Sequence, residues 1–219
     1  VPKAATADDL VRLRNDHVRA AELAVAHGVD GVELHAANGY LLGQFLNPRS
    51  NQRTDAYGGS AENRLRFVLE VVDATIAAIG QARVGIRLSP FNPFNDLASG
   101  FEGEREQFLA LVAKLAKRDI GYIHLAGGSV TGELLKDTRA IFPGTIIING
   151  GYDAARAEAD LAAGLVDLVS FGRHFISNPD LPERLRTGAP IADLDAATLY
   201  SPGAEGYTDY PRLDEAEAL

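Results

Sequence analysis

"VELHAANGYLLGQFLNP" (residues 32–48) begins as an apolar strand and then presents three hydrogen-bonding side chains within six positions. These side chains belong to His35, Asn38 and Tyr40. A strand that ends in clustered polar residues is typical of parallel α/β folds, in which functional side chains follow the carboxyl ends of the strands. The stretch therefore directs attention to what lies on either side of it.

Short apolar runs alternate with amphipathic segments along the rest of the chain. The continuous apolar character of these runs predicts strands buried on both faces, as in a parallel sheet. Thr6 and Ser60 are expected to cap the first two helices. The expected strands are 31–35, 83–89, 121–127, 145–151 and 167–173, and the expected helices are 7–27, 61–79, 105–117 and 153–163. The tail from residue 201 to 219 contains proline and glycine and is predicted to be irregular.

This alternation predicts an α/β fold, and two architectures compete for it. A doubly wound sheet would usually carry a glycine-rich fingerprint after its first strand, and the segment 31–39 does not. A TIM (β/α)8 barrel often binds phosphate with the loops after strands 7 and 8. The last two predicted strands end in Gly150–Gly151 and Gly172–Arg173, which suit that role. We therefore expect a barrel to which residues 1–219 contribute about strands 4–8.

Composition excludes several classes of protein. The formal net charge of −9 argues against a nucleic-acid-binding surface, although a local basic pocket for one phosphate remains compatible with it. No apolar run approaches the ~20 residues that span a bilayer, so no membrane association is expected. The chain has 0 cysteines, which rules out disulfides and thiolate ligands and fits a reducing, cytoplasmic location.

The residues from 35 to 40 have the chemistry of an oxyanion site. If the chain turns directly after the strand, His35 and Asn38 can converge and donate hydrogen bonds to one developing negative charge. Tyr40 adds a hydroxyl that can give a proton to a carbon. A plain structural interpretation stays open, because a histidine at a strand end often only bonds locally, Asn-Gly is a common turn and Tyr40 could pack.

Other titratable residues are assigned no functional role. Glu33 is expected to alternate away from His35, so no metal site is predicted. His17 and His27 fall on or at the end of the first helix, His124 is expected to fill the barrel interior, and His174 is given no role.

The stretch 32–67 closely resembles the old yellow enzyme family of flavin-dependent ene-reductases, including bacterial N-ethylmaleimide and pentaerythritol tetranitrate reductases. Four further stretches resemble the same family in the same order: "VGIRLSP" (84–90), "NGGYD" (149–153), "FGRHFISNPDLPERL" (171–185) and "YSPGAEGYTDYP" (200–211). The resemblance covers nearly the whole chain and implies a (β/α)8 barrel that binds FMN. Residues 51–64, the strongest signature, are interpreted as scaffold for a long loop.

The resemblance also implies roles for individual residues. His35 and Asn38 would bind the carbonyl or nitro oxygen of an activated alkene, such as an enone, enal, maleimide or nitroalkene. Tyr40 would protonate the α-carbon while the flavin, reduced by NADPH or NADH, gives hydride to the β-carbon. Arg87 would lie beside flavin N1, where a fixed cation stabilises the reduced, anionic ring. Gly150, Gly151, Gly172 and Arg173 would hold the FMN phosphate, and Tyr200 would lie near the substrate.

By this resemblance the first three barrel strands are absent from residues 1–219. Five strands cannot close a barrel, so we expect a complementary N-terminal fragment or chain. Two other functions compete with an ene-reductase: an inactive complementation fragment of such an enzyme, or another phosphate-binding TIM-barrel enzyme acting on a sugar phosphate. The latter lacks a Schiff-base lysine at a strand end, since Lys114, Lys117 and Lys136 are predicted on helices.

Overall fold

A computed structural model describes residues 3–126, 130–200 and 202–216. The chain divides into two compact units, each described by itself. The first comprises residues 1–151 and 159–169, and the second comprises residues 152–158 and 170–219.

Five parallel strands form one sheet in the order in which they occur in the chain. They are β1 (Val32–Ala36), β2 (Val84–Leu88), β3 (Tyr122–Leu125), β4 (Thr145–Asn149) and β5 (Leu168–Ser170). All five predicted strands are present, each within a residue of its predicted start and most of them shorter at the carboxyl end. Residue 127, predicted to end the third strand, lies outside the described residues. The sequential parallel order confirms the α/β prediction and is the order that a βα barrel requires.

The predicted helices are confirmed to within a residue at each end. They are α1 (Ala7–Ala26), α3 (Ala61–Ile79), α4 (Glu104–Ala116) and α6 (Ala154–Ala162). Thr6 caps α1 through a reciprocal capping box with Asp9, and the Ser60 hydroxyl accepts from the Asn63 amide. Five further helices occur in the described residues: α2 (Leu41–Leu46), α5 (Gly132–Ile141), α7 (Arg173–Ser177), α8 (Leu181–Thr187) and α9 (Leu213–Ala216). The last corrects the expectation of a wholly irregular tail.

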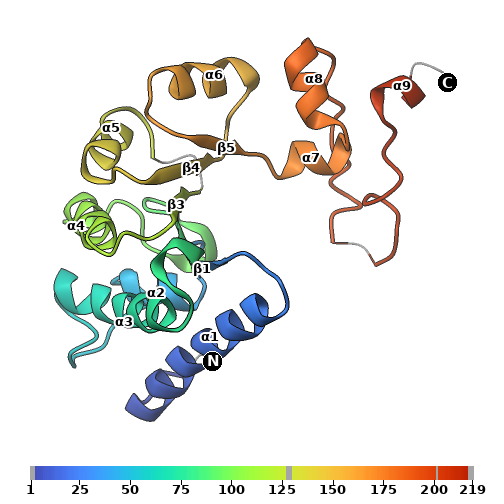
Figure 1. Cartoon of the computed structure of the whole chain (residues 1–219). Helices are drawn as coiled ribbons and strands as arrows, with labels where there is room; N and C mark the ends of the chain where they lie inside the picture. The colour runs from blue at the N-terminus through green and yellow to red at the C-terminus, as the bar shows by residue number, and fades with distance from the viewer. Residues whose placement is uncertain (1–2, 127–129, 201, 217–219) are drawn as a thin grey trace. The chain divides into compact units, whose positions relative to one another are not determined.

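The first unit has its core between the sheet and helices that include α3 and α4 (Figure 1). Alternate side chains of the strands point into this layer and are fully buried, among them Ile86, Ile123 and Ile146. From the helices they meet Phe67, Val72, Leu111 and Leu115, which are also fully buried. Each such side chain contributes ~1.5–3 kcal/mol through removal of apolar surface from water.

The other face of the sheet departs from the sequence prediction. Strands buried on both faces were expected, but β1 exposes Glu33 and His35, and Arg87 of β2 is half-buried on the same face. We call this the open face. It corresponds to the interior of a barrel, so its polar residues are those that a barrel would enclose around its mouth.

Close packing on the open face explains one glycine. A Cβ atom at Gly85 would lie 2.2 Å from the ring of Tyr122, its partner in the β2–β3 register. We expect Gly85→Ala to lower the free energy of unfolding by ~1–3 kcal/mol, the usual cost of overpacking. Urea denaturation measures this change. In a Tyr122→Ala background the extra methyl should cost nothing, and an undiminished cost there would show that the ring is not the obstacle.

The loop between α2 and α3 is fixed as the scaffold interpretation of residues 51–64 predicts. The Asn51 amide donates to the Phe45 and Tyr57 carbonyls at 2.8 and 2.7 Å. Arg53 pairs with Asp55 and donates to the Ala5 carbonyl at 2.6 Å. The loop that follows the candidate catalytic turn is therefore held by hydrogen bonds from side chains to backbone carbonyls.

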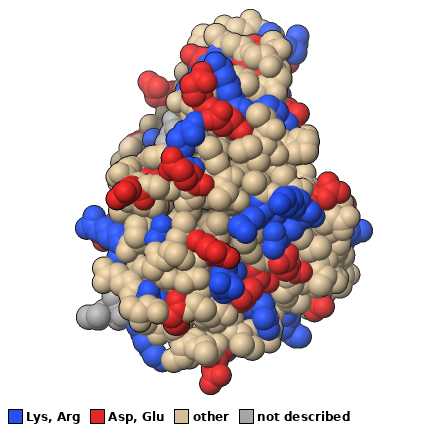
Figure 2. All heavy atoms as spheres, turned by 90° about the vertical axis from the view of Figure 1, so that its left-hand side faces the viewer, with Lys and Arg blue, Asp and Glu red and all other residues tan. Residues whose placement is uncertain are grey.

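The outer surface carries both signs of charge. Lys and Arg lie beside Asp and Glu across the face shown in Figure 2, and Arg118, just after α4, pairs with Asp73 of α3 at 2.6 Å. Among the described residues, none of the helices has the length and apolar character needed to cross a membrane.

Candidate active site

The chain turns sharply as soon as β1 ends. Asn38 and Gly39 both have left-handed φ values, 56° and 76°, and the Tyr40 amide donates to the Ala37 carbonyl at 3.2 Å. Glycine is required at the second position, because a Cβ there would lie 2.6 Å from Asn95. This geometry confirms that the chain turns directly after the strand. That turn is the condition under which His35 and Asn38 can converge on one site.

Asn38 is oriented by side chains from the segment after β2. Its backbone N–H donates to the Ser89 hydroxyl at 2.7 Å, and its backbone carbonyl accepts from the Asn95 amide at 2.9 Å. Its side-chain Oδ1 accepts from Asn92 Nδ2 at 2.9 Å. Because Oδ1 accepts this hydrogen bond, Nδ2 is the end of the amide left to donate.

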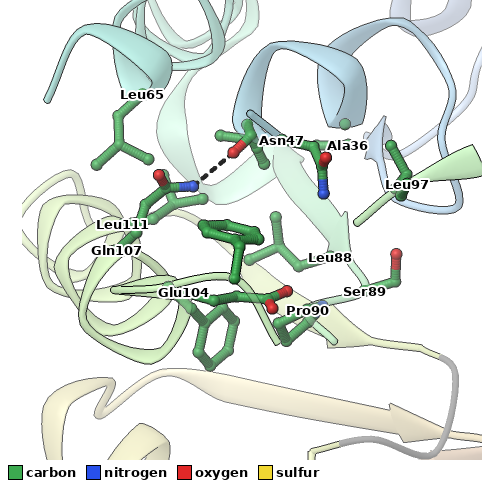
Figure 3. Close-up of a pocket in the computed structure, with 14 residues that line it drawn as sticks. Ala36, Asn47, Leu65, Leu88, Ser89, Pro90, Leu97, Glu104, Gln107 and Leu111 are labelled. Carbon is green, nitrogen blue, oxygen red and sulfur yellow. Dashed lines mark hydrogen bonds between the residues drawn. The ribbon is translucent and has the colours of Figure 1, made fainter. Parts of the chain in front are cut away.

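A buried carboxylate anchors the loop that carries these asparagines. Glu104 of α4 accepts from the Phe91 and Gly100 amides at 2.7 and 2.6 Å. It lines a cavity of about 60 Å³ between the sheet and the helices, together with Leu88, Ser89 and Gln107 (Figure 3). Leu88 points away from the open face, so this cavity lies behind the candidate site and is separate from it.

His35 and Tyr40 are brought together on the open face. Their ring centroids are 5.1 Å apart, and the Tyr40 side chain is 53% exposed. His35 lies opposite Arg87 in the β1–β2 register. Partial burial lowers the pKa of His35, the nearby Arg87 charge lowers it further, and Glu33 opposes both. The imidazole is therefore neutral at pH 7, with one N–H to donate.

Arg87 is held on both sides by groups of the open face. Its Nη1 lies 3.1 Å from both ring nitrogens of His124, and its Nη2 donates to Asn149 Oδ1 at 3.3 Å. The expectation that Glu33 turns away from His35 is wrong, because positions i and i+2 of a strand share a face. Glu33 faces the same side and accepts from His124 Nδ1 at 2.8 Å.

The remaining predicted residues are divided between the two units. Gly150 and Gly151 follow β4 with φ values of 101° and 70°, and Gly172 precedes α7, which Arg173 begins. Tyr200 is 92% exposed with φ 62°, and its backbone N–H donates to the Tyr207 hydroxyl at 2.8 Å. The phosphate site formed by Gly150, Gly151, Gly172 and Arg173, and the position of Tyr200 near the substrate, stay predictions.

The local sequence patterns did not predict the groups that support the site. Glu33, Tyr122, His124 and Asn149 all face the same side as His35 and Arg87. Their signal is a polar residue at every second position of an otherwise apolar strand, as in "VELHA" and "YIHL". No group of three potential metal ligands occurs within residues 3–126, 130–200 and 202–216.

Acid should weaken the fold through Glu33. Burial alone would raise its pKa, but the hydrogen bonds from His124 and Tyr122 and the charge of Arg87 bring it below 4.5. The unfolded chain therefore binds this proton first as the pH falls, and the free energy of unfolding drops below about pH 4.5. Urea unfolding at pH 7 and pH 4 should show a smaller loss in Glu33→Gln than in wild type. A matched control is Glu22→Gln on the exposed side of α1; equal losses in all three proteins would contradict this role.

Comparison with known proteins decides the family. The model of the NADH:flavin oxidoreductase / NADH oxidase family matches residues 1–191. The chain belongs to this family. Its relatives include 12-oxophytodienoate reductase 1 of Oryza sativa subsp. japonica, 40% identical over 99% of this chain and 59% of the relative. Enoate reductase 1 of Kluyveromyces lactis is 40% identical over 97% of this chain and 58% of the relative.

Solved members of this flavin oxidoreductase family have the same fold. Morphinone reductase in complex with tetrahydroNAD superposes with a TM-score of 0.91 at 44% identity, covering 98% of this chain and 59% of that one. An old yellow enzyme homologue from Zymomonas mobilis gives 0.90 at 37% identity, covering 97% and 62%. These matches confirm the resemblance to old yellow enzymes and the TIM-barrel prediction, and the five-stranded sheet fits strands 4–8. The chain spans 59% of the length of the rice relative.

Proposed function

We propose that this chain carries the substrate- and flavin-binding face of an FMN-dependent ene-reductase that uses NADPH or NADH to reduce activated alkenes. The supporting observation is the contact between His35 and Tyr40 beside Arg87, at the carboxyl ends of two neighbouring strands. In a chain that belongs to the flavin oxidoreductase family, this is the position at which barrel enzymes do their chemistry.

His35 and Asn38 bind the substrate oxygen. A neutral imidazole donates one N–H without placing a full positive charge beside Arg87, and the Asn38 amide, whose Oδ1 accepts from Asn92, has its Nδ2 hydrogens left to donate. Two such donors stabilise the negative charge that grows on a carbonyl or nitro oxygen. Removing one donor from a comparable site costs ~10²–10³ in rate.

Tyr40 holds the proton for the α-carbon. Its ring packs against His35, which fixes its position relative to the bound oxygen, and its exposure on the open face leaves the hydroxyl accessible to substrate. Bound FMN, once reduced, supplies hydride to the β-carbon of the alkene. The other proposed alkene-binding residue is Tyr200, through aromatic contact.

The residues present fit an anionic flavin. Arg87 places a cation on the open face with both terminal nitrogens supported, and a fixed cation favours negative charge at flavin N1. Gly150 and Gly151 adopt φ values that open the backbone after β4 to a phosphate. With Gly172 and Arg173 they are proposed to hold the FMN phosphate.

A complete barrel needs three further strands. β1 ends one side of the sheet in the described part of the chain, and the open face is polar where a barrel interior would be enclosed. We propose that a complementary N-terminal chain or segment pairs with β1 and covers this face. The site would then be assembled from both parts.

Flavin titration tests the proposal. The 219-residue chain is titrated with FMN alone and after co-expression with the part of morphinone reductase that lies outside the match. Stoichiometric yellow complex in either preparation supports the ene-reductase. A chain that assembles with the complement but binds no FMN would instead be the inactive complementation fragment, and tight binding of a sugar phosphate without flavin would indicate another phosphate-binding barrel enzyme.

Asn92 should matter without touching substrate. Asn92→Ala frees the Asn38 amide to rotate, so the FMN-loaded protein should bind phenol ~3–10-fold more weakly, the equivalent of one hydrogen bond. Thr75→Ala, which removes a buried hydroxyl from α3, is the matched control. Unchanged phenol affinity in Asn92→Ala would show that Asn38 does not depend on this contact.

A further inference from the structure

A second polar cluster lies across three strands, on the amino-terminal side of the proposed flavin contact at Arg87. The register places Glu33 of β1 opposite Gly85 of β2, which in turn lies opposite Tyr122 of β3. Two residues further along each strand, on the same face, His35, Arg87 and His124 form the next row. The two rows are joined because Glu33 reaches His124.

Glu33 contacts both of the other members of this cluster, His124 and Tyr122. Its Oε2 accepts from His124 Nδ1 at 2.8 Å, and the carboxylate also accepts from the Tyr122 hydroxyl. Tyr122 can reach so far because Gly85 has no side chain beneath the ring. The His124 side chain is nearly buried, at 9% exposed, and the Glu33 side chain is 29% exposed.

The protonation states of the cluster follow from these contacts. Burial and the neighbouring Glu33 charge raise the pKa of Tyr122 to about 12, so its hydroxyl is a permanent donor. Since the ionised Glu33 can only accept, the ring of His124 carries a proton on Nδ1. The ring orientation is thereby fixed, in the way that a carboxylate orients a functional histidine.

The fixed orientation of the His124 ring in turn restricts the position of the Arg87 guanidinium. Nη1 is equally distant from both nitrogens of His124, so the guanidinium rests against the imidazole ring as a whole, while Nη2 is held by Asn149. We propose that Glu33, Tyr122 and His124 act as positioning residues that hold the Arg87 guanidinium at the flavin edge. This inference rests on the proposed function, because it assigns the cluster the role of placing the Arg87 cation beside reduced FMN.

The midpoint potential of bound flavin is the readout that a merely structural role would not move. His124→Phe keeps a ring but loses both the bond to Glu33 and the ring nitrogens. We expect it to weaken binding of reduced relative to oxidised FMN about tenfold, which lowers the potential of a two-electron couple by about 30 mV. Tyr122→Phe, which removes one hydroxyl, should give a smaller shift in the same direction, and Thr75→Ala should give none.

A second measurement separates this inference from the proposed function. In the flavin-free chain, nitrogen NMR should show the His124 Nδ1–H proton in wild type, and Glu33→Ala should abolish it and shift the Arg87 side-chain signals. If wild type binds FMN and the midpoint potential is unchanged in His124→Phe, the positioning role is overturned. If wild type binds no FMN, the proposed function is overturned instead. The NMR signals then test the cluster by themselves: their loss in Glu33→Ala supports the contacts of Glu33, and their persistence refutes them.

Discussion

Replacing both His35 and Asn38 with alanine should lower the rate at which the reduced, FMN-loaded protein is reoxidised by 2-cyclohexenone by at least ~10³-fold. Each residue supplies one donor to the substrate oxygen, and loss of a single donor in an oxyanion site costs ~10²–10³ in rate. The single variants should each lose ~10²-fold or more, and the combined loss should be less than the product if the two act on one oxygen.

The double variant should retain its flavin, because neither side chain is assigned to FMN. Stopped-flow absorbance of the reoxidation step measures the effect, and the flavin to protein ratio provides the control. Asn92→Ala is an internal comparison, since it disturbs only the orientation of Asn38 and should lose far less. Reoxidation of the double variant within threefold of wild type would show that these side chains do not bind the reacting oxygen.

Replacing Arg87 with leucine should weaken binding of reduced FMN by ~10–100-fold while oxidised FMN binds more nearly as in wild type. The substitution removes the cation that offsets negative charge on the reduced ring, and a charge-assisted hydrogen bond contributes ~1.5–3 kcal/mol. Arg87→Lys, which keeps the charge but loses the planar fork held by His124 and Asn149, should lie between leucine and wild type.

Arg87→Leu also has a consequence that does not involve flavin. Burial and Arg87 together lower the pKa of His35, and Glu33 opposes them. Without the arginine, the pKa of His35 should rise, and proton NMR of the ring follows this titration. An unchanged His35 titration, together with an unchanged preference for reduced FMN, would place the guanidinium away from both groups.

The sequence was sufficient to predict the five strands and four of the helices that the described residues form. Apolar runs bounded by caps predicted five strands and four helices with starts accurate to a residue, because local periodicity and capping are encoded within each segment. The clustering of His35, Asn38 and Tyr40 at a strand end predicts a site at the carboxyl edge of the sheet, and the turn at Asn38–Gly39 on which that prediction depends is present.

The support of the site was less predictable, because it depends on register between strands. Glu33 was expected to turn away from His35, although a period of two places both on one face. That His124 contacts Arg87, and that Tyr122 crosses Gly85 to reach Glu33, depends on which residues of three separate strands lie opposite one another. Likewise Asn92 and Asn95 orient Asn38 across more than fifty residues of sequence, a relation that no local pattern contains.

The most direct test of the central claim is the flavin absorbance of the assembled protein, reduced anaerobically with NADPH and then mixed with 2-cyclohexenone. We expect NADPH to bleach the flavin band and the enone to restore it, at a rate that depends on His35 and Asn38. A flavin that bleaches but is not reoxidised by the enone, or that is reoxidised equally well without both side chains, would contradict it.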